Sequence, residues 1–298
     1  MKILILGGNG FIGKYYKKFS NIDELYSTTS KKKNKNIKFN ILYDDIEKIL
    51  GKYKITHVVI FAAISNPLEC EKKKILSERI NVIKMKKLIN KLIKNKKYFI
   101  YFSSEYVFDG KKGNYSEKSK INSKILYGKQ KGIIEKFLEK KNKKNFSIMR
   151  IGKTFGDEID DKSIFTNSLK DCLKNKKRLI VAIDQKFNAL YVKDLIKIID
   201  IFIKKNIIGI YNVCGDEQFT RLFYIKKIIN RFKFSNTKIV GKEFRYLTNL
   251  KNIPLNVSMN NCKLKKKIKF KFTKFETYLN IIFRKYEKKI KKEQLYKF

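Results

Sequence analysis

The sequence is poor in the residues that build disulfide and metal sites. Its 298 residues include four cysteines, one histidine, two prolines and no tryptophan. The cysteines (Cys70, Cys172, Cys214 and Cys262) are far apart and form no Cys-x-x-Cys pair. This spacing is typical of a reduced cytoplasmic protein and argues against a disulfide framework or a structural zinc ion. We therefore expect no metal centre.

Long apolar runs are also missing. No run approaches the ~18–20 residues that span a bilayer, so we expect no membrane partner. The first residues pass from a short apolar run, Ile3–Leu6, directly into glycines, without the small-residue cleavage site of a secretory signal. Together these absences predict a cytoplasmic globular protein.

Negative charge is scarce, with 27 acidic residues against 71 lysines and arginines and a net charge of +44. Such an excess can indicate nucleic-acid binding. Here the basic residues are nearly all lysine and are spread over almost every expected helix and loop, as a genome rich in AT codons would produce. We therefore expect no nucleic-acid partner, although a field of this sign attracts anionic substrates.

Apolar runs alternate with amphipathic segments along the first half of the chain. The expected strands are Ile3–Leu6, Leu25–Thr29, Ile37–Phe39, His57–Ala63, Tyr98–Ser103 and Phe146–Ile151, and the expected helices are Phe11–Phe19, Asp44–Gly51, Ile80–Lys94 and Ser123–Glu139. This alternation is typical of right-handed βαβ units. It predicts an α/β protein with a Rossmann-type, doubly wound parallel sheet.

The pattern loosens after about residue 157. Short strands are expected at Leu179–Ile183, Ile208–Val213 and Thr237–Val240, and helices at Ser163–Lys174, Val192–Lys205, Thr220–Phe232 and Phe283–Phe298. We expect a dinucleotide-binding domain over residues 1–157 and a smaller C-terminal α/β lobe over 158–298. Segments around 185–205 are expected to return to the first domain.

Three glycines follow the first strand at a spacing that suits a phosphate. Gly7, Gly10 and Gly13 form a Gly-x-x-Gly-x-x-Gly pattern between that strand and the first helix. Glycines allow the backbone to approach a pyrophosphate, and the helix N-terminus offsets its negative charge. The sequence therefore predicts dinucleotide binding at this loop.

The end of the second strand bears on which dinucleotide is bound. NAD sites usually place a carboxylate there to bind the ribose 2′-hydroxyl. This chain has Tyr26-Ser-Thr-Thr-Ser30-Lys31-Lys32 instead. Hydroxyl groups and ammonium groups at Ser30 and Lys31 favour the 2′-phosphate of NADP(H), and NAD(H) stays open as the alternative.

A serine, a tyrosine and a lysine are predicted to meet at the carboxyl edge of the sheet. Ser103 and Ser104 end the fifth strand, and Tyr127 and Lys131 share one face of the following helix. Ser104 can hold a substrate oxygen and Tyr127 can pass a proton to it. Lys131 can lower the pKa of the phenol and hold a nicotinamide ribose.

These motifs resemble those of a known family. The run Ser103-Ser-Glu-Tyr-Val-Phe-Asp-Gly110 resembles the Ser-Thr-Asp-Tyr-Val-Phe-Asp-Gly of dTDP-4-dehydrorhamnose reductases and related sugar-nucleotide reductases. These are extended short-chain dehydrogenase/reductases, and the resemblance covers nearly the whole chain. It implies Ser104, Tyr127 and Lys131 as the catalytic group.

The resemblance also implies residues that bind the cofactor and the substrate. For the cofactor these are Gly7, Asn9, Gly10, Phe11, Ile12, Gly13, Ser30, Lys31, Ala62, Ala63, Asn81, Tyr127 and Lys131. For the substrate they are Ser104, Tyr106, Phe108, Arg178, Asp184, Gln185 and Arg221, with Arg178, Arg221 and Arg245 as alternatives for meeting a diphosphate. Ile253 and Phe187 depart from the family pattern in the substrate segments and leave the sugar open.

The expected activity is NAD(P)H-dependent reduction of a keto group on a nucleotide-linked deoxysugar, in the synthesis of polysaccharide precursors. One alternative is an NAD-dependent epimerase or dehydratase of the same superfamily, although Tyr106 stands where a dehydratase would carry its second acid. Another is a non-catalytic regulatory homologue that keeps the nucleotide-sugar site. The sequence leaves open whether the protein forms a homodimer.

Overall fold

The computed structural model describes residues 1–30, 36–141, 145–158, 161, 163–173, 178–234 and 237–295. Its centre is a sheet of seven strands in the order β10-β6-β5-β4-β1-β2-β3, and every neighbouring pair is parallel. These strands are β1 (Ile3–Leu6), β2 (Leu25–Thr29), β3 (Ile37–Lys38), β4 (His57–Ile60), β5 (Tyr98–Ser104), β6 (Phe146–Ile151) and β10 (Gly209–Val213). The predicted Rossmann-type sheet is confirmed.

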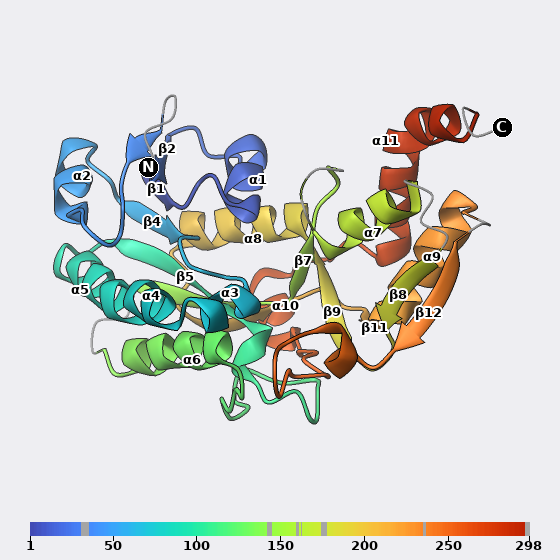
Figure 1. The fold of residues 1–298 in the computed structure, drawn as a ribbon. Helices are drawn as coiled ribbons and strands as arrows, with labels where there is room; N and C mark the ends of the chain where they lie inside the picture. The colour runs from blue at the N-terminus through green and yellow to red at the C-terminus, as the bar shows by residue number, and fades with distance from the viewer. Residues whose placement is uncertain are drawn as a thin grey trace.

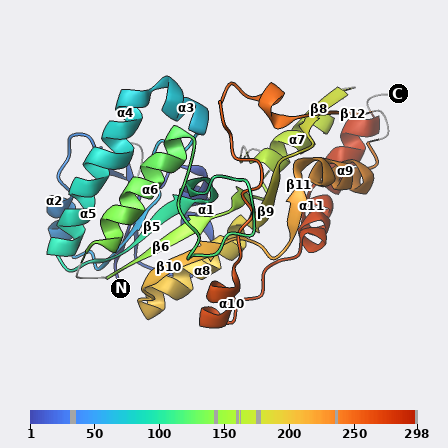
Figure 2. The same cartoon turned by 90° about the horizontal axis from the view of Figure 1, so that it is seen from below.

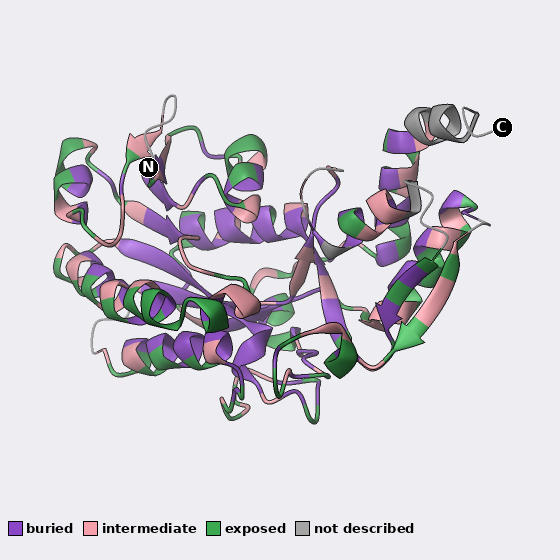
Figure 3. Ribbon diagram, viewed as in Figure 1, coloured by how far each residue is buried: buried purple, intermediate pink, exposed green. Residues whose placement is uncertain are grey.

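Helices cover both faces of this sheet (Figure 1). One face carries α2 (Ile46–Lys52), α5 (Met85–Lys94) and α6 (Leu126–Glu139), and the other carries α1 (Phe11–Phe19) and α8 (Val192–Lys205). The alternation of side chains along β1 produces this arrangement, because Ile3 and Ile5 enter one core while Leu4 and Leu6 enter the other. In Figure 3 the central strands are accordingly buried along most of their length.

A second, smaller lobe stands beside the carboxyl edge of the sheet. It contains a three-stranded sheet of β7 (Lys153–Phe155), β9 (Lys186–Tyr191) and β11 (Gln218–Thr220), and a parallel pair of β8 (Arg178–Ala182) and β12 (Lys238–Lys242). Helices α7 (Ile164–Leu173), α9 (Arg221–Phe232) and α11 (Phe275–Leu295) pack around an aromatic cluster that includes Phe155, Tyr191 and Tyr278. Figure 2 shows the two lobes from below.

The chain passes between the lobes more than once. After β7 and β9 it returns through α8 to the outer strand β10 of the large sheet, and then leaves again for β11. Short α10 (Cys262–Ile268) lies against β10, and α11 completes the small lobe. The boundary at residue 157 between two domains stays a prediction.

The segment before α5 differs from the expected single helix over 80–94. Helices α3 (Pro67–Lys72) and α4 (Lys74–Glu78) come first, and residues Arg79–Lys84 then form a π-helical turn, η1, before α5 begins. Within this turn the amide of Asn81 binds both the N–H and the carbonyl of Ile64, at 2.9 Å each. The wider turn thus brings a helix side chain to the loop after β4, as π-helical turns at functional sites often do.

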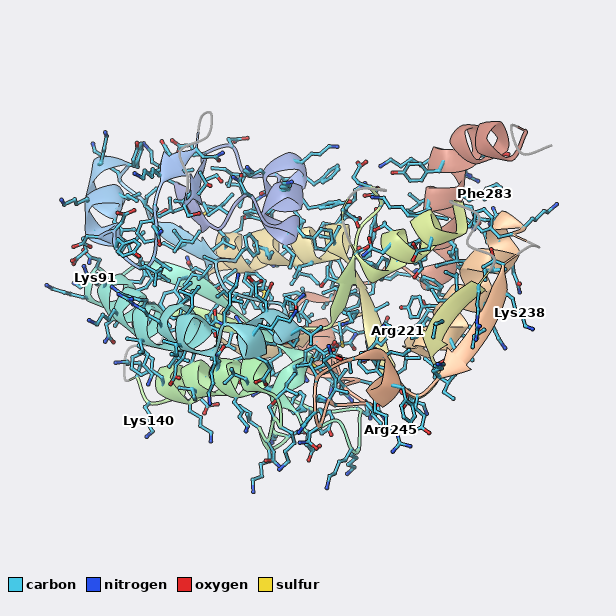
Figure 4. All side chains as sticks on the ribbon, viewed as in Figure 1. Lys91, Lys140, Arg221, Lys238, Arg245 and Phe283 are labelled. Carbon is cyan, nitrogen blue, oxygen red and sulfur yellow. The ribbon has the colours of Figure 1, made fainter. Side chains whose placement is uncertain are left out.

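Lysine side chains extend into solvent from separate helices, strands and loops, as the sequence predicts. Lys91 on α5, Lys140 after α6 and Lys238 on β12 are labelled in Figure 4 and lie far apart. Among the described helices, none is long and apolar enough to span a bilayer.

Candidate functional site

A cleft of about 770 Å³ opens where the carboxyl ends of the large sheet meet the small lobe. Its walls come from the glycine loop and α1, the loop after β4, the end of β5, the start of α6 and the strand β7. Its lining includes Asn9, Phe11 and Ile12 from the glycine loop and α1, and Ser104, Tyr106 and Tyr127 from the ends of β5 and α6. Open α/β sheets bind ligands at this edge.

The glycine loop has the shape that a pyrophosphate requires. Gly7 has φ +87°, and a Cβ at that position would lie 2.8 Å from the backbone nitrogen of Ala62. A Cβ on Gly13 would lie 2.6 Å from the carbonyl oxygen of Gly7, so the helix packs directly on the loop. No side chain caps the N-terminus of α1, and its first turn carries no acid. These N–H groups fit an anionic dinucleotide.

The structure describes most of the other residues that the sequence predicts for the cofactor. Ala62 and Ala63 follow β4 beside Gly7, and buried Asn81 holds the same segment through Ile64. Ser30 is exposed after β2, and the amide of Asn9 donates a hydrogen bond to Thr29 at 3.1 Å. Lys31, on which part of the NADP preference rests, lies outside the described residues.

Ser104, Tyr127 and Lys131 come together beside the cleft, and Ser104 and Tyr127 line it. Their exposed fractions are 6 %, 8 % and 5 %. The Ser104 hydroxyl accepts the N–H of Tyr106 at 3.2 Å, and it lies close enough to the Tyr127 phenol to favour the ionised form of that phenol. Lys131 donates from Nζ to the carbonyl of Phe102 at 2.6 Å, and its Nζ lies 5.8 Å from the centre of the Tyr127 ring.

The electrostatics of this group differ from the sequence expectation. Lys131 was expected to lower the pKa of Tyr127, but burial raises the pKa of the phenol, opposed by its hydrogen bond to Ser104. Burial also lowers the pKa of Lys131 to about 8. In this structure Tyr127 therefore holds its proton at neutral pH, which suits a group that donates a proton rather than one that removes it.

A buried ion pair fixes the helix that carries Tyr127 and Lys131. Glu135, one turn after Lys131, accepts hydrogen bonds from Arg150 on β6. Nη2 donates to Oε2 at 2.6 Å, and Nε donates to both oxygens, to Oε2 at 3.0 Å and to Oε1 at 3.2 Å. Ser103 also donates to Glu135, and Arg150 donates to the backbone carbonyl of Glu117. The pair ties α6 to the strands β5 and β6 beneath the catalytic group.

The predicted substrate residues are distributed over different places. Tyr106 lines the cleft, whereas Phe108 is fully buried and stacks on Tyr115. Arg178 is exposed at the start of β8, and Asp184 accepts the N–H of Phe244 beside a separate surface hollow. The structure therefore gathers Ser104 and Tyr106 at the cleft and leaves Phe108, Arg178 and Asp184 out of its lining.

Buried Gln185 and half-buried Arg221 form a polar pair outside the lining of the cleft. Arg221 begins α9 and donates from Nη2 to Oε1 of Gln185 at 2.5 Å, and burial lowers its pKa. Among the described residues, Nε of Arg221 and Nε2 of Gln185 have no acceptor, and Arg221 has no carboxylate partner. Arg221 shares a small cavity with Lys153, whose side chain also reaches the main cleft.

Two cleft residues were not predicted from the sequence, Glu105 and Lys153. Glu105 is next to Ser104 and only 2 % exposed, and its Oε2 accepts the N–H of Lys153 at 3.1 Å. Burial raises the pKa of Glu105 to about 7, although the charge of Lys153 opposes this. The only signal in the sequence was position, because Glu105 follows the strand-end serines.

Comparison with known proteins gives one family model and several kinds of relative. The RmlD substrate binding domain family matches residues 1–288. A dTDP-D-glucose 4,6-dehydratase of Dictyostelium discoideum is 30 % identical over 267 residues, which are 77 % of this chain and 62 % of that protein. A dTDP-4-dehydrorhamnose reductase of Aggregatibacter actinomycetemcomitans is 27 % identical over 180 residues, 58 % of this chain and 60 % of that protein. The chain thus spans about three fifths of the length of these two relatives.

A solved structure has the same fold. The dTDP-4-dehydrorhamnose reductase of Bacillus anthracis, in complex with NADP, superposes with a TM-score of 0.82 at 20 % identity. The match covers 96 % of this chain and 100 % of that one. It supports the two-lobed arrangement described above over nearly the whole length.

Proposed function

We propose that this chain, which belongs to the RmlD substrate binding domain family, reduces a keto group on a nucleotide-linked deoxysugar. The observation that carries the proposal is the meeting of Ser104, Tyr127 and Lys131 beside a cleft that the glycine loop also lines. The names of its relatives, which include a reductase and a dehydratase of dTDP-linked sugars, support the same substrate class.

The proposed roles follow from the positions of the side chains. Bound NADPH or NADH would supply the hydride. Ser104 and Tyr127 would hold the keto oxygen, and Tyr127, which keeps its proton at neutral pH, would protonate the alkoxide. Lys131 is fixed by Phe102 beside the phenol and would bind a ribose hydroxyl.

The cofactor preference is also a proposal. The end of β2 has hydroxyl groups and no acid between Tyr26 and Ser30, and the related structure from Bacillus anthracis contains NADP. We therefore expect NADPH to be preferred over NADH. Cytoplasmic location belongs to the same proposal.

The test is the oxidation of NADPH with a panel of nucleotide-linked keto sugars. We expect absorbance at 340 nm to fall in proportion to added 4-keto sugar, with one molecule of NADPH consumed for each sugar reduced. A dehydratase or epimerase would instead convert its sugar without net consumption of added NADPH. A protein that binds NADPH and oxidises none with any sugar would be the non-catalytic homologue.

Arg221 is the arginine that we propose for the substrate diphosphate. Its side chain is half-buried and forms no ion pair with a carboxylate among the described residues, whereas Arg245 pairs with Glu243 at 2.8 Å and is 66 % exposed (Figure 4). A hydrogen bond to a charged group contributes about 1.5–3 kcal/mol, so Arg221→Gln should raise the KM for the nucleotide sugar about 10- to 100-fold. The value of kcat should change less than about threefold, because the diphosphate does not react.

Steady-state kinetics with saturating NADPH measure this effect. Arg284→Gln, which removes an exposed arginine on α11, is the matched control and should leave KM unchanged. If Arg178→Gln or Arg245→Gln raises KM while Arg221→Gln does not, the assignment to Arg221 is wrong.

A further inference from the structure

The carboxyl group of Glu105 has no role in the reduction described above, although it lies in the same cleft. It follows Ser104 directly and lines the cleft together with Tyr106 and Tyr127. The N–H of Lys153 holds one carboxyl oxygen, Oε2, at 3.1 Å. Among the described residues no donor contacts the other oxygen, Oε1. A carboxyl fixed at one oxygen and open at the other can exchange a proton with a bound ligand.

Charged and titratable groups face Glu105 from several elements. Lys153 on β7 is the cation, and its Nζ donates to the hydroxyl of Tyr106 at 3.4 Å. The other groups are Tyr127 on α6, Tyr224 on α9 and Cys214 after β10. The charge of Glu105 raises the pKa of each of them. Since the phenols and the thiol are neutral at pH 7, Lys153 is the one charged neighbour in this set.

The surroundings of Tyr127 and Glu105 suit them for opposite tasks. Tyr127 keeps its proton and can hydrogen-bond to a carbonyl oxygen. Burial brings the pKa of Glu105 to about 7, so near neutral pH a large part of the carboxyl groups can accept a proton. A carbonyl that receives hydrogen bonds makes the C–H bond on the adjacent carbon more acidic, and a nearby carboxylate is the base that this chemistry needs.

We propose that Glu105 is a second proton-transfer group, which removes and returns a proton on the carbon next to the keto group of the bound sugar. The inference rests on the proposed function, because it needs a keto sugar in this cleft. The C–H bond breaks and its proton moves to Oε1, and the electron pair forms the C=C bond of an enolate. The charge on the enolate oxygen is stabilised by Tyr127 and Ser104. The reverse step restores the ketone, so no oxidant or reductant is consumed.

Incorporation of deuterium from solvent tests this proposal. The protein is incubated in D₂O with NADP⁺, which has no hydride to give, and with a dTDP-linked 4-keto-deoxyhexose, and the sugar is analysed by mass spectrometry and proton NMR. We expect deuterium at a carbon beside the carbonyl, well above the rate without enzyme. The exchange rate should rise with pH through about 7 and then level, because the ionised carboxyl is the base.

Glu105→Gln keeps an oxygen that accepts the Lys153 N–H and removes the base. Exchange should fall at least about 100-fold, which is the usual contribution of a general base, while NADPH oxidation should change less than about threefold. Glu158→Gln is the matched control. Its carboxylate lies at the same cleft but is already paired with Lys18 and Lys285, so exchange should not change.

The outcomes separate this inference from the reductase assignment. NADPH oxidation without deuterium uptake, or equal exchange in wild type and Glu105→Gln, would overturn the role of Glu105 and leave the reductase intact. Exchange without any NADPH oxidation would support Glu105 and overturn the reductase. Absence of both would overturn both. The pH profile of the wild-type protein gives a readout that does not depend on how well the variant folds.

Discussion

Tyr127→Phe is expected to lower the rate of keto-sugar reduction by about 10²- to 10⁴-fold, the range that a positioned general acid contributes. Phenylalanine keeps the ring that packs at 6.5 Å from Tyr106 and removes only the hydroxyl that meets Ser104. The fold and the glycine loop should therefore be unaffected. The measurement is NADPH oxidation at saturating sugar, with NADPH binding followed separately by fluorescence.

The binding constant for NADPH should change less than about threefold in Tyr127→Phe. Tyr43→Phe is the control, since Tyr43 is 75 % exposed and far from the cleft lining. Turnover by Tyr127→Phe at the wild-type rate would show that another group protonates the alkoxide. Loss of NADPH binding would instead mean that the hydroxyl acts on the cofactor.

Glu135→Gln is expected to destabilise the protein by about 3–5 kcal/mol, because it leaves the guanidinium of Arg150 buried without its counter-charge. The two residues are 0 % and 1 % exposed, so water cannot take the place of the lost carboxylate. Urea unfolding at neutral pH measures the change. Glu139→Gln, one turn later on the exposed side of α6, should change stability by less than about 0.5 kcal/mol.

The double variant Glu135→Met with Arg150→Met separates the loss of the pair from the loss of one partner. Replacing both charges with apolar groups of similar length should cost less than Glu135→Gln alone, since no unpaired charge remains. If Glu135→Gln is as stable as Glu139→Gln, then the ion pair does not hold α6 in place.

Much of the large sheet could be predicted because local pattern and burial agree there. Ile3–Leu6 is apolar on both sides and is buried on both faces, and the helix Val192–Lys205 has the predicted bounds. The glycine spacing and the strand-end serines identified the cleft, because the topology of parallel sheets brings strand ends together.

Other features depend on contacts that a linear pattern does not contain. The π-helical turn before α5 exists because Asn81 must reach Ile64, and periodicity alone predicts an uninterrupted helix. The strands β7, β9 and β11 are short and pair across long stretches of chain, so they were missed. Helix α11 begins at Phe275, eight residues before the expected start, where Phe275 joins the aromatic cluster.

The protonation states at the site could not be predicted from the sequence either. The four-residue spacing of Tyr127 and Lys131 predicts that the lysine lowers the pKa of the phenol. Burial outweighs this effect, and the extent of burial follows from tertiary packing. Glu105 is a similar case, since an acid beside Ser104 is visible in the sequence but its enclosure by Lys153 and the small lobe is not.

The repeated passage of the chain between the lobes limits how the two lobes can be recombined between related proteins. Strand β10 pairs with β6 at the edge of the large sheet, but in the sequence it follows β7, β8 and β9 of the small lobe. A single genetic cut near residue 157 would separate β6 from β10 and from the covering helix α8, and would expose an unpaired strand edge. The small lobe therefore cannot be exchanged between relatives as one contiguous module. Under the proposed function, a change of sugar specificity would need substitutions within the small lobe rather than its replacement.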